Sequence, residues 1–286
     1  MQWSSLFVHA FDHRSQLEQM ARETGADVGR LSLLKQLLLT ATRNIAEKGS
    51  LQQCSGILCD DTFGQDVLNA ASGSNLWIGR PVEVPGSIPV EFEGASSIGS
   101  RLKSWPGEQV VTCLVYYSTE DNEQLRHQQE LRIIELYQSC CESGHQLLLE
   151  IIPPQETLER GASLQRSVAR LFEIGVRPDW WKIPCVTREY VQQICTLIDN
   201  TTPWCCGVLV LGPDAPSDEL AKGFEAFRGM PQVRGFAAGH SIFGEPARQW
   251  LDGSIEDTQL ISQVESNYAE IIDLWQRSTG DNTSSV

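Results

Sequence analysis

Two charged residues lie inside apolar segments of the chain. Glu150 stands within the segment LLLEII, and Lys182 stands within WWKIP. Burying either charge costs free energy unless the charge is paired or neutralised. If the two segments are neighbouring β-strands, about 4.8 Å apart, the side chains can meet. A desolvated lysine can then add to a substrate carbonyl as a Schiff-base nucleophile, while the glutamate moves protons. A structural ion pair is the alternative interpretation.

Short apolar segments alternate with amphipathic stretches along the chain. Their spacing predicts strands at 6–11, 56–60, 76–78, 110–116, 146–152, 179–183, 207–211 and 235–238. Helical periodicity predicts helices at 15–48, 121–143, 160–174, 188–199, 218–228 and 243–251, and a C-terminal helix at 254–278. Eight strand–helix units predict an α/β fold, a (β/α)8 TIM barrel with an extra C-terminal helix. A doubly wound open sheet is the alternative, which the absence of GxGxxG after the first strand weakens.

The length of 286 residues suits one barrel. We expect residues 1–278 to form a single domain and the polar residues 279–286 to form a disordered tail. The proline-rich stretch 81–93 predicts an extended loop between a strand and the next helix.

The C-terminal ends of the strands are where TIM barrels carry the residues that act on substrate. Besides Lys182 and Glu150, this rule selects as substrate-binding residues Asp12, Arg14, Asp60, Arg80, Gly212, Gly239 and His240. The two arginines can bind carboxylate or phosphate oxygens or form ordinary ion pairs. The two aspartates can bind hydroxyl groups or cap the following helices. The two glycines can offer backbone N–H groups to an anion, or they can simply make tight turns. The histidine can bind substrate, or it can form a hydrogen bond within its loop.

Composition argues against several classes of partner. The chain has 22 Lys and Arg against 37 Asp and Glu, a formal net charge of −15. Nucleic acids and anionic membranes attract cationic faces, so we expect neither as a partner. No apolar run approaches the ~20 residues of a membrane span, and the first residues lack the basic start of a signal peptide.

The nine cysteines form no CxxC pair and no zinc-binding spacing with histidine. We interpret them as reduced thiols of a cytoplasmic protein. The five histidines are scattered along the chain, so we expect no metal and no cofactor.

Several motifs together resemble one known family. They are FDHR at 11–14, RPVE at 80–83, LLEI at 148–151, PDWWK at 178–182 and GHSIFG at 239–244. They look like the aldolase-like domain of myo-inositol catabolism, which is often fused behind 5-dehydro-2-deoxygluconokinase. More distantly they are similar to class I tagatose-1,6-bisphosphate aldolase. The resemblance covers nearly the whole chain, from about residue 7 to residue 275.

The resemblance implies a role for each matched position. Lys182 would be the Schiff-base lysine, Glu150 the general acid/base, and Asp12 and Arg14 would lie at the mouth of the site. The implied reaction is cleavage of 6-phospho-5-dehydro-2-deoxygluconate to a three-carbon ketose phosphate and malonate semialdehyde. Two positions depart from the family pattern, because Thr112 stands where relatives usually have lysine and His240 where they usually have arginine. A neutral histidine lacks the fixed fork of donors of arginine, so the phosphorylation of the substrate stays open.

The sequence therefore predicts a carbon–carbon lyase, a metal-independent class I aldolase that acts on a keto-sugar acid or a ketose, phosphorylated or not. A non-catalytic sugar-binding barrel is one alternative. A barrel hydrolase that pairs Glu150 with Asp12 or Asp60 is another. The expected partner is a small carbohydrate. The C-terminal helix with Trp275 can pack on the barrel or on a second subunit, so a homo-oligomer is also compatible with the sequence.

Overall fold

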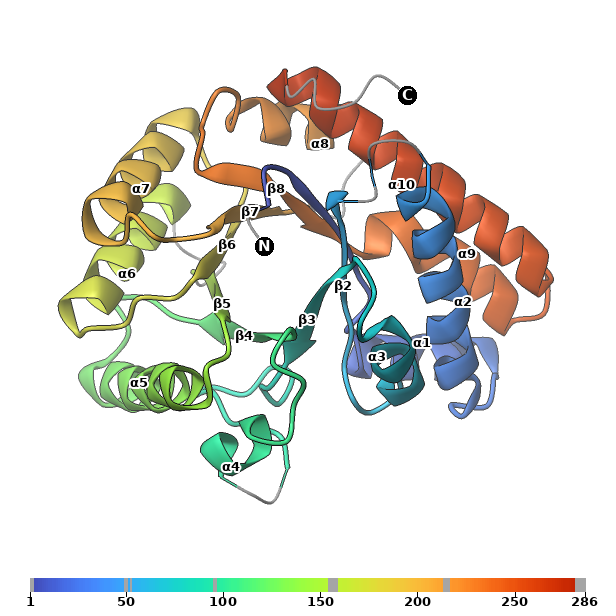
Figure 1. Cartoon of the computed structure of the whole chain (residues 1–286), viewed down its shortest axis with the longest axis horizontal. Helices are drawn as coiled ribbons and strands as arrows, with labels where there is room; N and C mark the ends of the chain where they lie inside the picture. Colours follow the sequence, from blue (N-terminus) through green and yellow to red (C-terminus); the bar gives the residue numbers. More distant parts are fainter. Residues whose placement is uncertain are drawn as a thin grey trace. The chain divides into compact units, whose positions relative to one another are not determined.

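The computed structural model describes residues 3–48, 51, 53–94, 97–153, 159–212 and 217–280. Within these ranges, parallel strands close into a barrel in sequence order (Figure 1). They are β1 (Leu6–Ala10), β2 (Ser55–Leu58), β3 (Trp77–Pro81), β4 (Val110–Tyr116), β5 (Leu147–Ile152), β6 (Trp180–Pro184), β7 (Gly207–Leu211) and β8 (Val233–Ala238). The helices are α1 (Ser15–Thr24), α2 (Arg30–Ala46), α3 (Gln65–Ala71), α4 (Ile98–Leu102), α5 (Glu123–Ser143), α6 (Arg160–Glu173), α7 (Arg188–Thr201), α8 (Ser217–Glu225), α9 (His240–Leu251) and α10 (Asp257–Thr279). The predicted TIM barrel with a C-terminal helix is confirmed, and the open sheet is not formed.

The single helix predicted at 15–48 is wrong. Gly25 ends α1, because it adopts a left-handed φ of 74° and its N–H turns back to the carbonyl oxygens of Ala21 and Arg22. A glycine tolerates this conformation without the steric penalty of a Cβ atom. The chain then makes a short turn, and α2 begins at Arg30. Two short helices, α3 and α4, were not predicted, and α9 begins at His240, three residues before the prediction.

Contacts between Cα atoms group the chain into two compact units. Unit 1 comprises Met1–Arg80, Gly212–Glu225 and Gly235–Val286, and unit 2 comprises Pro81–Leu211 and Ala226–Arg234. Each unit is described by itself below. The single domain at 1–278 stays a prediction. The tail predicted at 279–286 lies outside the described residues from position 281 onward.

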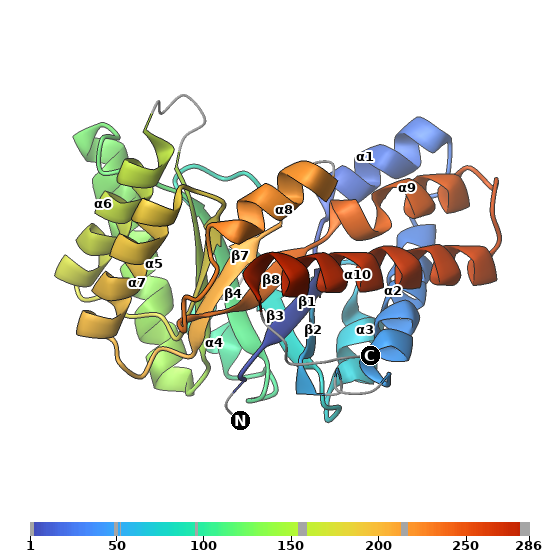
Figure 2. The same ribbon diagram turned by 90° about the horizontal axis from the view of Figure 1, so that it is seen from above.

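The C-terminal helix completes the core of unit 1. Helix α10 runs alongside α2, α8 and α9 (Figures 1 and 2). The buried Trp275 ring meets Phe224 of α8 edge-on, with ring centroids 4.8 Å apart, and lies 5.9 Å from Phe236 of β8. The Tyr268 hydroxyl donates to the backbone oxygen of Phe7 over 2.8 Å, which ties α10 to β1. Over the described residues, neither α10 nor any other helix is both long and apolar enough to cross a membrane.

A buried histidine of unit 1 lies between β1 and the helices. The His9 side chain is fully buried, and its ring stacks on Tyr268 with centroids 5.5 Å apart. The Thr42 hydroxyl donates to the Leu38 carbonyl, so its oxygen accepts from His9 Nδ1–H over 2.8 Å. Within the described residues Nε2 has no hydrogen-bond partner. Burial, with a smaller contribution from His13, lowers the pKa of His9 to about 3.

Acidification should therefore destabilise the fold through His9. The unfolded chain takes up a proton at this residue below its ordinary pKa of 6.5, whereas the folded chain does so only near pH 3. This contribution to stability is complete well above pH 6.5, and about 2 kcal/mol of it is lost between pH 6.5 and pH 4.5. Urea unfolding at both pH values should show a smaller acid loss for His9→Phe, which keeps the ring packing. Because the carboxylates are common to both proteins, equal acid losses would contradict the assignment.

Three helices cover the outer face of β4–β7 in unit 2, namely α5, α6 and α7 (Figure 1). The inner face of these strands carries the charged residues that the sequence singled out. Register in this sheet is continuous, because β5 pairs in parallel with β4 and β6, and β6 pairs in parallel with β7.

Candidate active site

Lys182 and Glu150 form a buried ion pair across two neighbouring strands of unit 2. Lys182 lies in β6 and Glu150 in β5, and their Cα positions are direct partners in the parallel ladder. Lys182 Nζ donates to Glu150 Oε2 over 2.8 Å, and each side chain is only 7% exposed. The expectation that these two side chains meet is confirmed. Their pairing also explains how both charges are tolerated inside apolar strands.

Strand alternation places the pair on the interior face. The Trp181 ring meets Phe172 of α6 edge-on, with centroids 5.5 Å apart, so Trp181 faces the helices. Lys182 is the next residue along β6 and therefore points the opposite way, as does Trp180. The Trp180 indole donates to Gln146 Oε1 over 3.1 Å. Lys182 therefore has an aromatic ring on its own face, one pleat away.

Apolar side chains flank the ion pair in the same row of the sheet. Leu114 of β4 is the register partner of Glu150, and Leu209 of β7 is the partner of Lys182. Thr112 lies two residues before Leu114 and is buried on the same face. This position presents a hydroxyl where the sequence resemblance leads us to expect an amine. Leu209 is fully buried and Leu114 is half-buried, so apolar neighbours limit the contact of the pair with water and strengthen its electrostatic interaction.

Sequence reasoning did not select Glu83 as a site residue. Its segment continues the ladder beyond β3, because Val82 N donates to Thr112 O over 3.1 Å. The Glu83 side chain is buried, and its Oε2 accepts from the backbone N–H of Leu114 over 3.3 Å. Glu83 therefore places a second carboxylate beside Leu114 of β4, the register partner of Glu150. The RPVE motif contained this acid, but no strand was predicted there.

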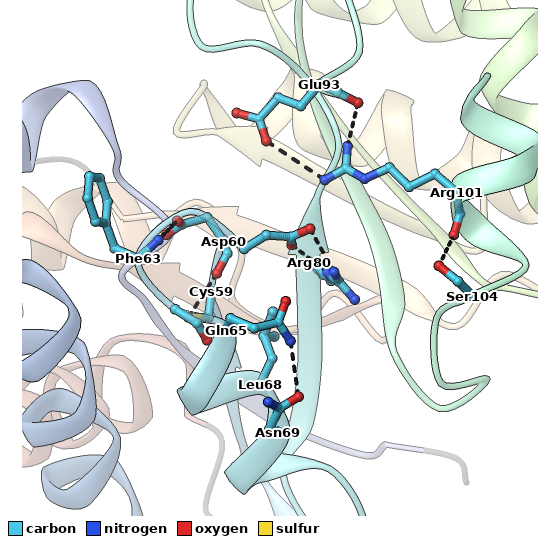
Figure 3. Close-up of polar contacts among 12 residues, drawn as sticks. Cys59, Asp60, Phe63, Gln65, Leu68, Asn69, Arg80, Glu93, Arg101 and Ser104 are labelled. Carbon is cyan, nitrogen blue, oxygen red and sulfur yellow. Dashed lines mark hydrogen bonds and ion pairs between the residues drawn. The ribbon is translucent and has the colours of Figure 1, made fainter. Parts of the chain in front are cut away.

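The stretch predicted as an extended loop at 81–93 turns back on itself, with an antiparallel bridge between Glu83 and Phe92. The fully buried Gln129 of α5 holds it in place, because its amide accepts from Val90 N over 2.6 Å and donates to Tyr116 O over 2.7 Å. At the end of the stretch, the Arg101 guanidinium donates to the Glu93 backbone oxygen over 2.9 Å (Figure 3). Glu83 is thus carried on an anchored segment.

In unit 1 the residues after β1 include two predicted substrate ligands. Arg14 is the N-cap residue of α1, and its own side chain makes no capping hydrogen bond. The Asp12 carboxylate is about one quarter exposed and lies 4.0 Å from His13 Nδ1. Arg14 is buried. The roles of Asp12 and Arg14 in substrate binding stay predictions.

The fully buried Asp60 is engaged on both oxygens. Its Oδ1 accepts from Lys35 Nζ. Its Oδ2 accepts from Phe63 N over 2.9 Å (Figure 3). Each oxygen of this carboxylate thus has an internal donor, and the side chain has no exposed surface. This geometry favours an internal role for Asp60 over the predicted contact with substrate or over a hydrolytic role.

Arg80 is likewise committed within unit 1. Its Nε donates to Asp61 Oδ1 over 2.5 Å, and its Nη2 donates to Asp61 Oδ2 over 2.6 Å. This bidentate pairing is the ion-pair alternative that the sequence allowed for this arginine. Substrate binding by Arg80 stays a prediction, and the geometry favours the pairing.

The two predicted glycines lie where backbone segments approach closely. A Cβ atom on Gly212 would lie 2.8 Å from the Ala238 side chain, and one on Gly239 would lie 2.2 Å from the Ala10 carbonyl oxygen. Close packing therefore explains both residues, and their binding of anions stays a prediction. His240 follows as the first residue of α9, and its ring centroid lies 6.3 Å from that of His13. His240 remains a predicted substrate ligand.

The two acids that follow β2 could in principle bind a metal ion, but each is already paired with a cation. Asp60 is bonded to Lys35, and the other acid after β2, Asp61, to Arg80. Across the described ranges, no three His, Cys, Asp or Glu side chains gather closely enough to hold a metal ion.

Comparison with known proteins places this chain in a family. The family model described as "Uncharacterized protein conserved in bacteria (DUF2090)" matches residues 1–279. The chain belongs to the DUF2090 family. No curated protein matches this DUF2090 chain.

Solved structures resemble the DUF2090 chain in fold. One is a Corynebacterium glutamicum protein, with 16% identity, a TM-score of 0.57 and coverage of 98% of this chain and 86% of the other. A second is an archaeal fructose 1,6-bisphosphate aldolase, with 10% identity, a TM-score of 0.55 and coverage of 93% and 94%. A third is the fructose-bisphosphate aldolase from Slackia heliotrinireducens, with 11% identity, a TM-score of 0.58 and coverage of 92% and 86%. At these identities the likeness is one of fold.

Sequence reasoning also overlooked a buried amine of the DUF2090 chain, Lys35. This residue lies on α2 and is fully buried, although lysines on helices are usually exposed. Its hydrogen-bond acceptors, the Phe11 carbonyl and the Asp60 carboxylate, lie 24 and 25 residues away in sequence, so no local pattern predicts these contacts.

Proposed function

We propose that this DUF2090 protein is a class I aldolase that uses Lys182 as its Schiff-base amine and Glu150 as its general acid/base. The observation that carries the proposal is the buried 2.8 Å contact between Lys182 Nζ and Glu150 Oε2 on the interior face of the barrel. Two of the similar folds are fructose-bisphosphate aldolases, which supports carbon–carbon lyase chemistry for this chain as well.

The pair can perform the proton transfers of a retro-aldol reaction. Lys182 gives a proton to Glu150, and the resulting neutral amine adds to the substrate keto carbon. Glu150 returns the proton to the carbinolamine oxygen, takes one from the nitrogen, and gives it to the departing hydroxyl. Water leaves and an iminium forms. Each step uses the Glu150 carboxylate, which lies within hydrogen-bond reach of the nitrogen.

Bond cleavage then uses the iminium as an electron sink. Glu150 takes the proton from the hydroxyl on the β carbon, and that carbon leaves as an aldehyde. The electron pair of the broken C–C bond moves toward nitrogen and forms an enamine. The enamine carbon takes the proton back from Glu150, and water hydrolyses the imine to release the ketone and restore Lys182.

The proposed substrate is a keto-sugar acid or a ketose related to 6-phospho-5-dehydro-2-deoxygluconate. This choice, and a place in myo-inositol catabolism, rest on the sequence resemblance. Thr112 and His240 replace two expected cations. Both phosphorylated and unphosphorylated ketones therefore belong in any substrate panel.

Borohydride trapping tests the proposal. The protein is mixed with dihydroxyacetone phosphate, dihydroxyacetone, or a panel of larger keto-sugars, then reduced and weighed intact by mass spectrometry. We expect the mass of the reduced adduct, mapped to the peptide that carries Lys182. Thermal stabilisation by a ketone without an adduct would favour a sugar-binding barrel instead. An adduct only on exposed lysines such as Lys103 would count against the assignment.

A further inference from the structure

Lys35 makes three hydrogen bonds in the interior of unit 1. Its side chain is fully buried on α2. Nζ donates to the backbone oxygen of Phe11 over 2.7 Å, to that of His13 over 3.1 Å, and to Asp60 Oδ1. An ammonium group has three N–H donors and no acceptor, so these partners saturate it. The carboxylate also balances its charge.

The acceptors belong to two segments that follow barrel strands. Phe11 and His13 flank Asp12 in the segment after β1, so Lys35 bonds the carbonyl on each side of this residue. Asp60 belongs to the segment after β2, which its second oxygen also ties down through Phe63 N. A single amine thus joins α2 to both segments, and it does so without touching the Asp12 side chain.

An apolar side chain would fill the same space at lower electrostatic cost, because buried ion pairs are often replaceable by hydrophobic residues. Such a side chain cannot bind carbonyl oxygens and so cannot fix the peptide units beside Asp12. We propose that Lys35 is a positioning residue, which holds Asp12 and Arg14 in the conformation that binds substrate. The role rests on the proposed aldolase function, in which these two residues are predicted ligands.

Three variants separate positioning from support of the fold. Lys35→Met leaves the Asp60 charge buried without its cation, and Asp60→Asn leaves the Lys35 charge without its anion. The double variant Lys35→Met/Asp60→Asn removes both charges and keeps an acceptor for Phe63 N. Lys222→Met, at an exposed lysine of the same unit, is the matched control.

The first measurement is amide hydrogen exchange of residues 12–14. We expect the double variant to recover most of the melting temperature that Lys35→Met loses, yet to exchange these amides at least about tenfold faster than wild type, because their segment has lost its anchor. Unchanged exchange would overturn the inference. This result does not depend on any reaction, so it stands or fails separately from the aldolase proposal.

The second measurement is borohydride trapping over a range of dihydroxyacetone phosphate concentrations. We expect the double variant to need about five- to tenfold more probe for half-maximal trapping, with a similar maximal rate because Lys182 is intact. Faster exchange with unchanged half-saturation would make Lys35 a purely structural residue and overturn the positioning role. Absence of trapping in wild type would instead refute the aldolase proposal, and the exchange result would still decide whether Lys35 fixes the segment.

Discussion

Replacing Lys182 by methionine is expected to abolish borohydride trapping and to lower kcat by about 10⁴-fold or more, the scale seen when a covalent nucleophile is removed. Methionine has a similar length but no amine, so the carbinolamine cannot form. The contact with Glu150 is lost as well, and one partner of a buried pair is left charged. We therefore also expect a loss of about 3–5 kcal/mol in the free energy of unfolding.

The double variant Lys182→Met/Glu150→Gln controls for that instability. It removes both charges of the pair, so much of the stability should return, while activity should stay at the level of Lys182→Met. Lys103→Met, at an exposed lysine of unit 2, should match wild type in both trapping and rate. Retention of turnover by Lys182→Met would refute the Schiff-base assignment.

Glu150→Gln is expected to lower kcat by about 10²–10⁴-fold, the usual contribution of a general acid/base. Glutamine can still accept a hydrogen bond from Lys182, but it cannot take up or return a proton at neutral pH. Dehydration of the carbinolamine and cleavage of the C–C bond should both slow. Single-turnover reactions, quenched with borohydride at successive times and analysed by mass spectrometry, measure the rate of iminium formation and the rate of C–C cleavage separately.

Comparing the two substitutions also tests the hydrolase alternative. If carboxylates carried out hydrolysis of glycosides, Glu150→Gln would stop it and Lys182→Met would leave most of the activity. An aldolase should lose more from Lys182→Met than from Glu150→Gln. A wild-type rate for Glu150→Gln would reduce Glu150 to a structural counter-charge of Lys182.

The ion pair was predictable because an acid and an amine inside apolar strand segments are each strong signals, and sequential strands of a TIM barrel are neighbours. The register then brings Glu150 and Lys182 opposite each other. The alternation of strand and helix was equally informative, since each buried strand repeats the same pattern of short apolar runs. The first and last residues of each strand were less predictable, because the strands continue into apolar turns.

Other features depend on tertiary contacts that have no local signature. Lys35 lies on an amphipathic helix like any surface lysine, and only the carbonyls after β1 and the carboxylate after β2 reveal its role. Glu83 belongs to a proline-rich stretch in which no strand pairing could be foreseen. Gly25 did carry a usable signal, since glycine commonly ends helices, but the strong periodicity on either side of it concealed the break.

The two units differ in how their segments are ordered along the chain, and therefore in when the ribosome completes each of them. Most of unit 2 is the continuous stretch Pro81–Leu211, whereas unit 1 joins the first segment of the chain to the last. Phe7 stacks on Phe236, which in turn lies against Trp275. At roughly 5–20 residues per second, the ribosome needs about 10–40 s to make the ~200 residues that separate these segments. During that interval the apolar first strand emerges without its neighbours β8 and α10. Lesions in the last helix prolong this exposure beyond the end of synthesis, so we expect them to appear as aggregation of the completed chain.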